Sequence, residues 1–288
     1  MSEQAIQKHK EPELVVLLKK ATSGIAQALP KHLSADRMCR IALTALRTTP
    51  NLLQCSPASF LGSVIQASQL GLEVNTPLGY AYLIPYGKVC QLLIGYQGML
   101  ELARRSGRTK AVYAFPVYDG DKFSYTLGLN PTLEHEPAGI THDPKRLTHA
   151  YAVAKLLDGE PVFTVLTRDD IEAARSRSRA KNNGPWVTDY EAMAVKTAVR
   201  RLFKWLPKSA EMAVAVAVDE SIETTRSQFS AMDPDVQELL LAQGVEATEE
   251  DLGTVDVETP APVPPEQDGQ RIKLGKKPEP IRQPGEEG

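Results

Sequence analysis

The segment with the densest charge chemistry is residues 194–208, "AVKTAVRRLFKWLPK", which places five cations in fifteen positions. On a helix, Lys196, Arg200 and Lys204 repeat every four residues and share one face with Arg201, while the apolar side chains lie on the opposite face. We call these four cations the basic stripe. Like charges four residues apart destabilise a helix by about 0.2–0.5 kcal/mol per pair. The basic stripe therefore predicts an anionic partner.

Aromatic rings and further cations surround the basic stripe. Residues 175–208 hold nine positive and two negative charges, together with Trp186, Tyr190, Phe203 and Trp205. Cations bind phosphates, and flat rings stack on bases with about 1–3 kcal/mol per base whatever the base is. The combination predicts a site for single-stranded nucleic acid. The alternative is a solvated basic face, with Phe203 and Trp205 in the core.

Signals for other chemistry are weaker. The five histidines form neither an HxH nor an HExxH pattern. Asp119 and Asp121 in "VYDGDKF" are better explained by a hairpin turn than by a metal pair, because Asp-Gly favours turns and no third ligand is near. The segment containing Gly95 and Gly98 lacks the GxGxxG and GxxxxGK[ST] patterns of nucleotide sites. We expect no metal, no cofactor and no catalytic residue, and hence no enzyme; a nuclease would need clustered carboxylates.

Composition and charge place the protein in a class. The 288 residues are 42% hydrophobic, enough for one large domain or two small ones. No run of about 18 apolar residues and no apolar segment after "MSEQAIQKHKEPE" occurs, so we expect neither a membrane span nor a signal peptide, and a cytoplasmic location. The three cysteines have unrelated spacings, which favours buried thiols over disulfides or a metal site.

The net charge of −3 hides an asymmetry. Residues 1–210 hold 27 Lys and Arg against 18 Asp and Glu, whereas residues 211–288 hold 6 against 18. A basic body favours a polyanionic partner, and its acidic tail either mimics that partner or is a solubilising linker. From about residue 246 the chain is acidic, rich in proline and without aromatic residues, which predicts disorder.

The hydrophobic pattern predicts an α+β fold with N-terminal helices, a β-hairpin and a small antiparallel or mixed sheet packed with helices. Ser34, Ser56 and Thr167 are expected helix caps, the last with Asp170 as its capping-box partner. Gly87 is expected in the hairpin turn. The expected helices span 13–29, 34–49, 56–71, 96–107, from 167, 190–206, 209–226 and 233–244, and the expected strands span 79–86, 89–95, 110–118, 122–128, 148–157 and 161–167.

Three long motifs carry a family resemblance. They are "LGLEVNTPLGYAYLIPYGKVCQLLIGYQGMLELARRSG" (70–107), "VYDGDKFSYTLG" (117–128) and "PWVTDYEAMAVKTAVRRLFKWLP" (185–207). In this order and spacing, the chain closely resembles the RecT family of phage single-strand annealing proteins over about residues 10–225. The resemblance implies a recombinase that coats single-stranded DNA and anneals it to a complementary strand without ATP, as an oligomeric ring or helical filament in the bacterial host. A passive coat protein without annealing activity is the alternative.

The resemblance also implies where DNA binds and which partners act. The first-rank contacts are the basic stripe, and the second-rank contacts are Arg104, Arg105, Arg179 and Lys181. The stacking candidates are Tyr96, Trp186 and Phe203, for each of which a core position is an equal alternative. A phage exonuclease is the implied partner, and the tail is either a tether for it or for the host single-strand-binding protein, or a spacer.

The expected organisation has four parts. Residues 1–30 form an N-terminal helical segment that contributes oligomer contacts, and residues 31–228 form the DNA-binding and annealing core. Residues 229–245 form a short helical segment, and residues 246–288 form the disordered acidic, Pro-rich tail.

Overall fold

The computed structural model describes residues 13–30, 33–139, 143–178, 181–182, 184–223, 228, 234–242 and 244–252. Arg179, one of the expected DNA contacts, lies outside these residues, and so does most of the expected tail. The architecture is α+β, as the sequence predicts. Within the described residues no helix is both long and apolar enough to cross a membrane.

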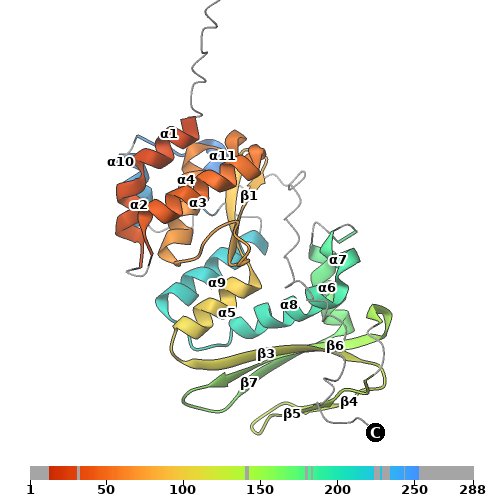
Figure 1. The fold of residues 1–288 in the computed structure, drawn as a ribbon. Coiled ribbons are helices and arrows are strands. Elements are labelled where there is room, and N and C mark those ends of the chain that lie inside the picture. The colour runs from red at the N-terminus through yellow and green to blue at the C-terminus, as the bar shows by residue number, and fades with distance from the viewer. Residues whose placement is uncertain are drawn as a thin grey trace, which may run out of the picture.

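Helices form the N-terminal part of the fold (Figure 1). Ser34 and Ser56 cap their helices as expected, because their side chains accept hydrogen bonds from the amides of Arg37 and Ser59. The helix expected over 13–29 is instead two helices, which meet at Ala21. The elements are α1 (Glu13–Lys20), α2 (Thr22–Ala28), α3 (Ala35–Thr48), the 3-10 helix η1 (Pro50–Gln54) and α4 (Pro57–Gln69). Residues 58–68 of α4 are all buried, so this helix is the centre of the N-terminal part.

The expected hairpin consists of β1 (Ala81–Tyr86) and β2 (Val89–Ile94), paired antiparallel around Gly87, whose φ is 56°. Helix α5 (Tyr96–Arg105) follows immediately and lies very close to the start of the hairpin. A Cβ on Gly95 would lie 2.1 Å from the Gly79 carbonyl oxygen, and one on Gly98 would lie 2.1 Å from that of Tyr80. The two glycines thus permit backbone contact, which is a packing role.

A three-stranded antiparallel sheet forms the other end of the molecule. Its order is β3-β6-β7, with β3 Thr109–Tyr118, β6 Leu147–Leu156 and β7 Val162–Thr167. A separate hairpin joins β4 (Lys122–Thr126) to β5 (Thr132–Glu136), and the short 3-10 helix η2 (Pro144–Arg146) leads into β6. Strand β5 was not predicted. The antiparallel pairing resolves the alternative that the sequence left open between an antiparallel and a mixed sheet.

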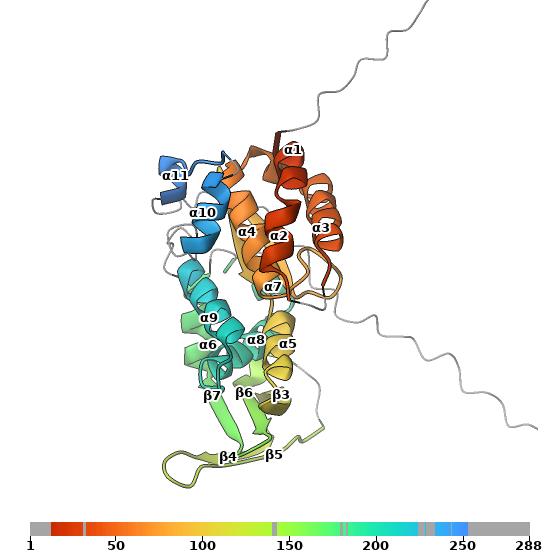
Figure 2. The same ribbon diagram turned by 90° about the vertical axis from the view of Figure 1, so that its left-hand side faces the viewer.

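Helices in the middle of the molecule connect its two ends. Helix α8 (Tyr190–Phe203) covers one face of the β3-β6-β7 sheet, and α5 and α9 (Ala210–Glu223) lie between α8 and the N-terminal helices (Figures 1 and 2). Helix α6 (Arg168–Arg177) follows β7 and is capped by the expected box of Thr167 and Asp170. The short α7 (Pro185–Thr188) precedes α8. One hydrophobic core runs from α1 to the sheet, and Cys39, Cys55 and Cys90 are buried free thiols, as expected.

The end of the described chain returns to the N-terminal helices through α10 (Pro234–Ala242) and α11 (Glu249–Leu252) (Figure 2). Asp251 is fully buried, and the Ser56 hydroxyl donates to it at 2.5 Å. Asp251 also accepts hydrogen bonds from the amide and hydroxyl of Thr248, both at 2.8 Å. Residues 246–252, expected to begin the tail, therefore belong to the folded body.

Candidate nucleic-acid interface

Helix α8 positions the basic stripe. Ala194, Ala198, Val199 and Leu202 are buried, and α8 packs them toward the sheet and the neighbouring helices. The stripe residues lie on the remaining surface, where each is partly exposed. The helix ends at Phe203, earlier than predicted, so Lys204 is its C-cap.

Arg200, Arg201 and Lys204 of the stripe pair with carboxylates on neighbouring helices. Arg200 on α8 contacts Asp219 on α9 through Nε and Oδ2 at 3.2 Å and through Nη2 and Oδ1 at 2.7 Å. Arg201 Nη1 lies 3.3 Å from the Asp170 Oδ1 atom, and Lys204 Nζ lies 3.1 Å from the Glu220 Oε1 atom. Carboxylates on α6 and α9 thus balance part of the charge of the stripe, and the anionic partner stays a prediction.

The three pairs differ in burial, and burial decides which cation can change partner. The side chain of Asp219 is 5% exposed, so removing Arg200 from it would leave a carboxylate in the interior. The Lys204–Glu220 and Arg201–Asp170 pairs are between 36% and 53% exposed. Exposed pairs of this kind contribute about 0–1 kcal/mol. A phosphate can therefore replace the carboxylate on Arg201 or Lys204 at little cost, whereas Arg200 joins α8 to α9.

The stacking candidates separate into two core rings and one half-buried ring. Trp186 is 4% exposed and makes an edge contact with Tyr190, and Phe203 is 2% exposed. For these two the core alternative holds. Tyr96 is half-buried, and its hydroxyl accepts a hydrogen bond from Gln97 Nε2 at 2.7 Å.

Trp205, one of the rings noted around the stripe, is 74% exposed and was not among the stacking candidates. A core position was one of two alternatives for this ring, but α8 ends two residues before it and the indole lies on the surface. Pro207 was the available signal, because a residue before proline is restricted away from helix and α8 had to end near this point.

The second-rank cations have different roles. Arg104, on the last turn of α5, is 74% exposed and pairs with Glu101 at 2.7 Å. Arg105 Nη2 donates to the Leu70 carbonyl at 2.7 Å, which ties α5 to the end of α4. The pKa of Glu211 is lowered, first by a hydrogen bond from Ser209 and also by the charge of Arg105, so the end of α5 lies near the start of α9.

Lys181, two residues after Arg179 in the sequence, is exposed and lies in a turn. Its carbonyl oxygen accepts a hydrogen bond from Arg175 Nε at 3.0 Å. The Lys181 backbone thus anchors the side chain of Arg175, while the side chain of Lys181 belongs to the exposed surface.

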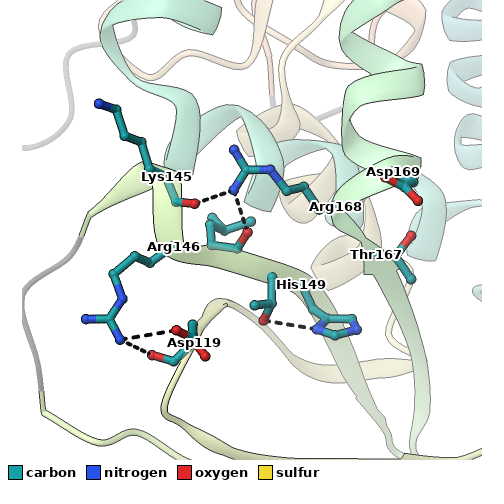
Figure 3. Close-up of a pocket in the computed structure, with 9 residues that line it drawn as sticks. Asp119, Lys145, Arg146, His149, Thr167, Arg168 and Asp169 are labelled. Atoms are coloured by element: carbon teal, nitrogen blue, oxygen red, sulfur yellow. Dashed lines mark hydrogen bonds and ion pairs between the residues drawn. The ribbon is translucent and has the colours of Figure 1, made fainter.

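A pocket of about 490 Å³ lies at the far end of the sheet, where β6 begins, and none of the expected site residues that the structure describes lines it (Figure 3). Arg168 Nη1 donates there to the carbonyl oxygens of Lys145 at 2.7 Å and of Leu147 at 3.0 Å. Arg146 Nη2 donates to the Asp119 carbonyl oxygen at 2.9 Å. These arginines hold the β3–β4 turn and the start of β6 in place, in agreement with the turn expected at Asp119.

Comparison with known proteins defines the class. The model of the RecT family matches residues 36–232, a later start than the resemblance over about residues 10–225 suggested. The chain belongs to the RecT family and is a single-strand annealing protein of DNA recombination, whose function is not catalytic. The protein named "Protein RecT" of Escherichia coli (strain K12) is 50% identical over 204 residues, which cover 68% of this chain and 75% of that protein. "Uncharacterized protein YqaK" of Bacillus subtilis (strain 168) is 29% identical over 182 residues, 62% of each chain.

Proposed function

We propose that this chain holds single-stranded DNA on the surface at the C-terminal ends of α5 and α8, where Arg104 and Trp205 are exposed and Arg201 and Lys204 are partly exposed. The observation that carries the proposal is an exposed indole directly after a lysine whose carboxylate partner is itself exposed. Such a pairing serves a single strand, because the cation neutralises a phosphate and the ring stacks on a base. In this proposal Lys196 and Lys181 also contact the phosphate backbone of the DNA. Arg105 and Arg200 instead hold the helices in place.

Annealing requires no general acid or base, because no covalent bond is made or broken. Two anionic strands must approach each other, and the bases of the first must stay accessible to the second. A surface that grips the backbone and leaves the Watson–Crick edges exposed meets both needs. Duplex formation supplies about 1.4 kcal/mol per base-pair step, so no ATP is needed to drive the pairing.

Assembly would extend this surface over many nucleotides. We propose that protomers pack side by side into a ring or helical filament in the bacterial cytoplasm, with contacts that include the N-terminal helices. A phage exonuclease would generate the single strand, and the host single-strand-binding protein would compete for it or be recruited. Residues beyond 252 are the proposed tether for either partner.

Fluorescence transfer between two complementary labelled oligonucleotides tests the function. They are added in turn to the purified protein, without nucleotide, at two salt concentrations. We expect pairing well above the spontaneous rate and slower pairing at higher salt. The Lys204→Gln and Trp205→Ala variants should lose much of the acceleration, whereas Lys122→Gln, on the distant β4–β5 hairpin, should retain it. Binding without acceleration would instead identify a passive coat protein.

A further inference from the structure

A small pocket lies where α5 turns into β3. It has a volume of about 150 Å³ and is lined by Leu100, Arg104, Thr109, Lys110, Ala111 and Val112. We infer that this pocket binds one internal phosphodiester of the single strand, through Arg104, Thr109 and Lys110. The inference rests on the proposed function and extends the DNA path from α8 to the start of the sheet.

The local backbone brings the two cations together. Helix α5 ends at Arg105, Gly107 reverses the chain with a φ of 67°, and β3 begins at Thr109. The strand register shifts between Thr109, opposite Leu156, and Ala111, opposite Lys155, so Lys110 is an extra residue in β3. A bulge of this kind redirects a side chain away from the regular alternation of a strand.

The charges at this pocket are available to a ligand. The carboxylate partner of Arg104 is Glu101, one turn earlier on the same helix, and the Arg104 side chain is 74% exposed. Lys110 is exposed, and its side chain makes neither a hydrogen bond nor an ion pair with the described part of the chain. The Glu101 side chain is 16% exposed and also lies 3.6 Å from Arg105 Nε, so it keeps a cation when Arg104 turns toward an anion. An anion entering the pocket therefore competes with Glu101 for Arg104 and displaces no side-chain partner from Lys110.

The third group is a buried hydroxyl without a partner. Thr109 is 6% exposed, and its Oγ1 atom has no hydrogen-bond partner among the described residues. Buried polar groups in native proteins are nearly always hydrogen-bonded, because an unsatisfied one is costly. A phosphate oxygen is an acceptor for this hydroxyl, and the same phosphate would bind the two cations.

The size and position of the pocket favour a backbone phosphate over a whole nucleotide. A volume of about 150 Å³ is below the roughly 300 Å³ at which pockets for drug-sized ligands begin. The apolar side chains of Leu100 and Val112 suit the sugar next to the phosphate. Helix α5 packs against both α8 and α9, and the C-terminal ends of α5 and α8 lie on the same side of the molecule (Figure 1). One strand can therefore pass from the end of α8 to this pocket.

Two variants test the pocket, because each should weaken DNA binding without lowering the stability of the fold. The Thr109→Val variant keeps the shape and removes the unpartnered hydroxyl. We expect its urea midpoint to equal or exceed that of the wild type, while its affinity for a 5′-hydroxyl oligo-dT falls about tenfold. The Lys110→Gln variant should reduce the slope of log affinity against log salt by about 0.7, with an unchanged urea midpoint. The control Lys122→Gln removes the same charge far from the pocket and should keep the wild-type slope.

The design separates failure of the pocket from failure of the proposed function. If Lys204→Gln and Trp205→Ala weaken binding but Lys110→Gln and Thr109→Val bind like the wild type, the pocket assignment is overturned and the function stands. If the wild type does not bind the oligonucleotide, both are overturned. If the Lys110→Gln variant loses the same affinity for 5′-hydroxyl and for 5′-phosphorylated oligo-dT, the pocket binds an internal phosphodiester. A loss of affinity for the phosphorylated oligonucleotide alone, or one that millimolar inorganic phosphate abolishes, would overturn this assignment. The pocket would then bind a terminal or an inorganic phosphate.

Discussion

Arg200 on α8 and Asp219 on α9 form a two-point ion pair, with Nε to Oδ2 at 3.2 Å and Nη2 to Oδ1 at 2.7 Å. The arginine belongs to a helix surface that looks, from sequence, like a binding face. Its partner carboxylate is almost fully buried, so the pair joins two helices. Charge at a protein surface is therefore divided between cations that fix the fold and cations that remain exchangeable, and burial of the partner separates the two groups.

The Arg200–Asp219 pair predicts a stability effect. The Arg200→Gln variant should lower the free energy of unfolding by about 3–5 kcal/mol, because it leaves an interior carboxylate without its cation. The matched Lys204→Gln variant breaks an exposed pair and should change this free energy by no more than about 0.5 kcal/mol. Urea unfolding followed by circular dichroism measures both. Equal midpoints for the two variants would show that the Arg200–Asp219 pair is not structural.

A second prediction concerns the exchangeable cations. The Arg201→Gln and Lys204→Gln variants should each lower the salt slope of single-strand affinity by about 0.7, because each removes one phosphate contact. Fluorescence anisotropy of a labelled oligonucleotide over a range of salt concentrations gives the slope. Lys122→Gln is the control, since Lys122 pairs with Glu136 on the distant hairpin. If both stripe variants show the same salt slope as the control, the end of α8 does not contact the DNA.

The two tryptophans of the chain give a third prediction, because Trp186 is buried and Trp205 is exposed. The Trp205→Ala variant should weaken single-strand binding by about 1–3 kcal/mol through lost stacking and leave the urea midpoint unchanged. Trp186→Ala should cost about 3–5 kcal/mol of stability as a core truncation. In a Trp186→Phe background, single-stranded DNA should quench the remaining fluorescence. If DNA instead leaves that emission and its accessibility to acrylamide unaltered, Trp205 does not stack on a base.

Local sequence codes predicted much of the fold. The caps at Ser34, Ser56 and Thr167 depend on a side chain and an amide three residues later, so the sequence contains both partners. Strand β5 was missed because its sequence, "TLEHE", has little apolar character and its pairing with β4 defines it. The charge partners of the stripe were missed for a related reason. Asp219 lies 19 residues from Arg200, in a different helix, so no local pattern links the two residues.

The site shows the same limit. Cation types and spacing indicated the helix proposed to bind DNA. The helical projection did not show which of the residues in and after this helix are buried and which are exposed. Phe203 lies in the core while Trp205 is exposed, because α8 ends between them. The exposed fraction of a ring near a helix end depends on where the helix stops, and that position is the least certain part of a sequence prediction.

A fourth prediction concerns pH. Burial raises the pKa of Asp170, but hydrogen bonds from Thr167 and the charge of Arg201 outweigh burial, so the net pKa lies below the ordinary value. A carboxyl with a depressed folded-state pKa contributes stability above its unfolded pKa, about 3.9, and loses it as the pH falls through the folded value. Asp170→Asn should therefore be less stable than the wild type at pH 7, and the difference should shrink once the pH falls below about 3.9. Urea midpoints from about pH 2 to pH 7 measure this; a difference that stays constant over the whole range would contradict it.

The last prediction concerns where the folded body ends. Asp251 accepts hydrogen bonds from Ser56, the cap of α4, and from Thr248, so α11 stabilises the start of the most buried helix. A chain truncated after Leu252 should keep the wild-type urea midpoint. A chain truncated after Val245 should unfold at lower urea, because it loses Asp251. The chain that ends at Leu252 is then tested for co-purification with a phage exonuclease or the host single-strand-binding protein. Because this chain stays folded, a lost interaction cannot be attributed to unfolding and supports the tether. A partner that still co-purifies with the chain ending at Leu252 would make residues 253–288 a spacer.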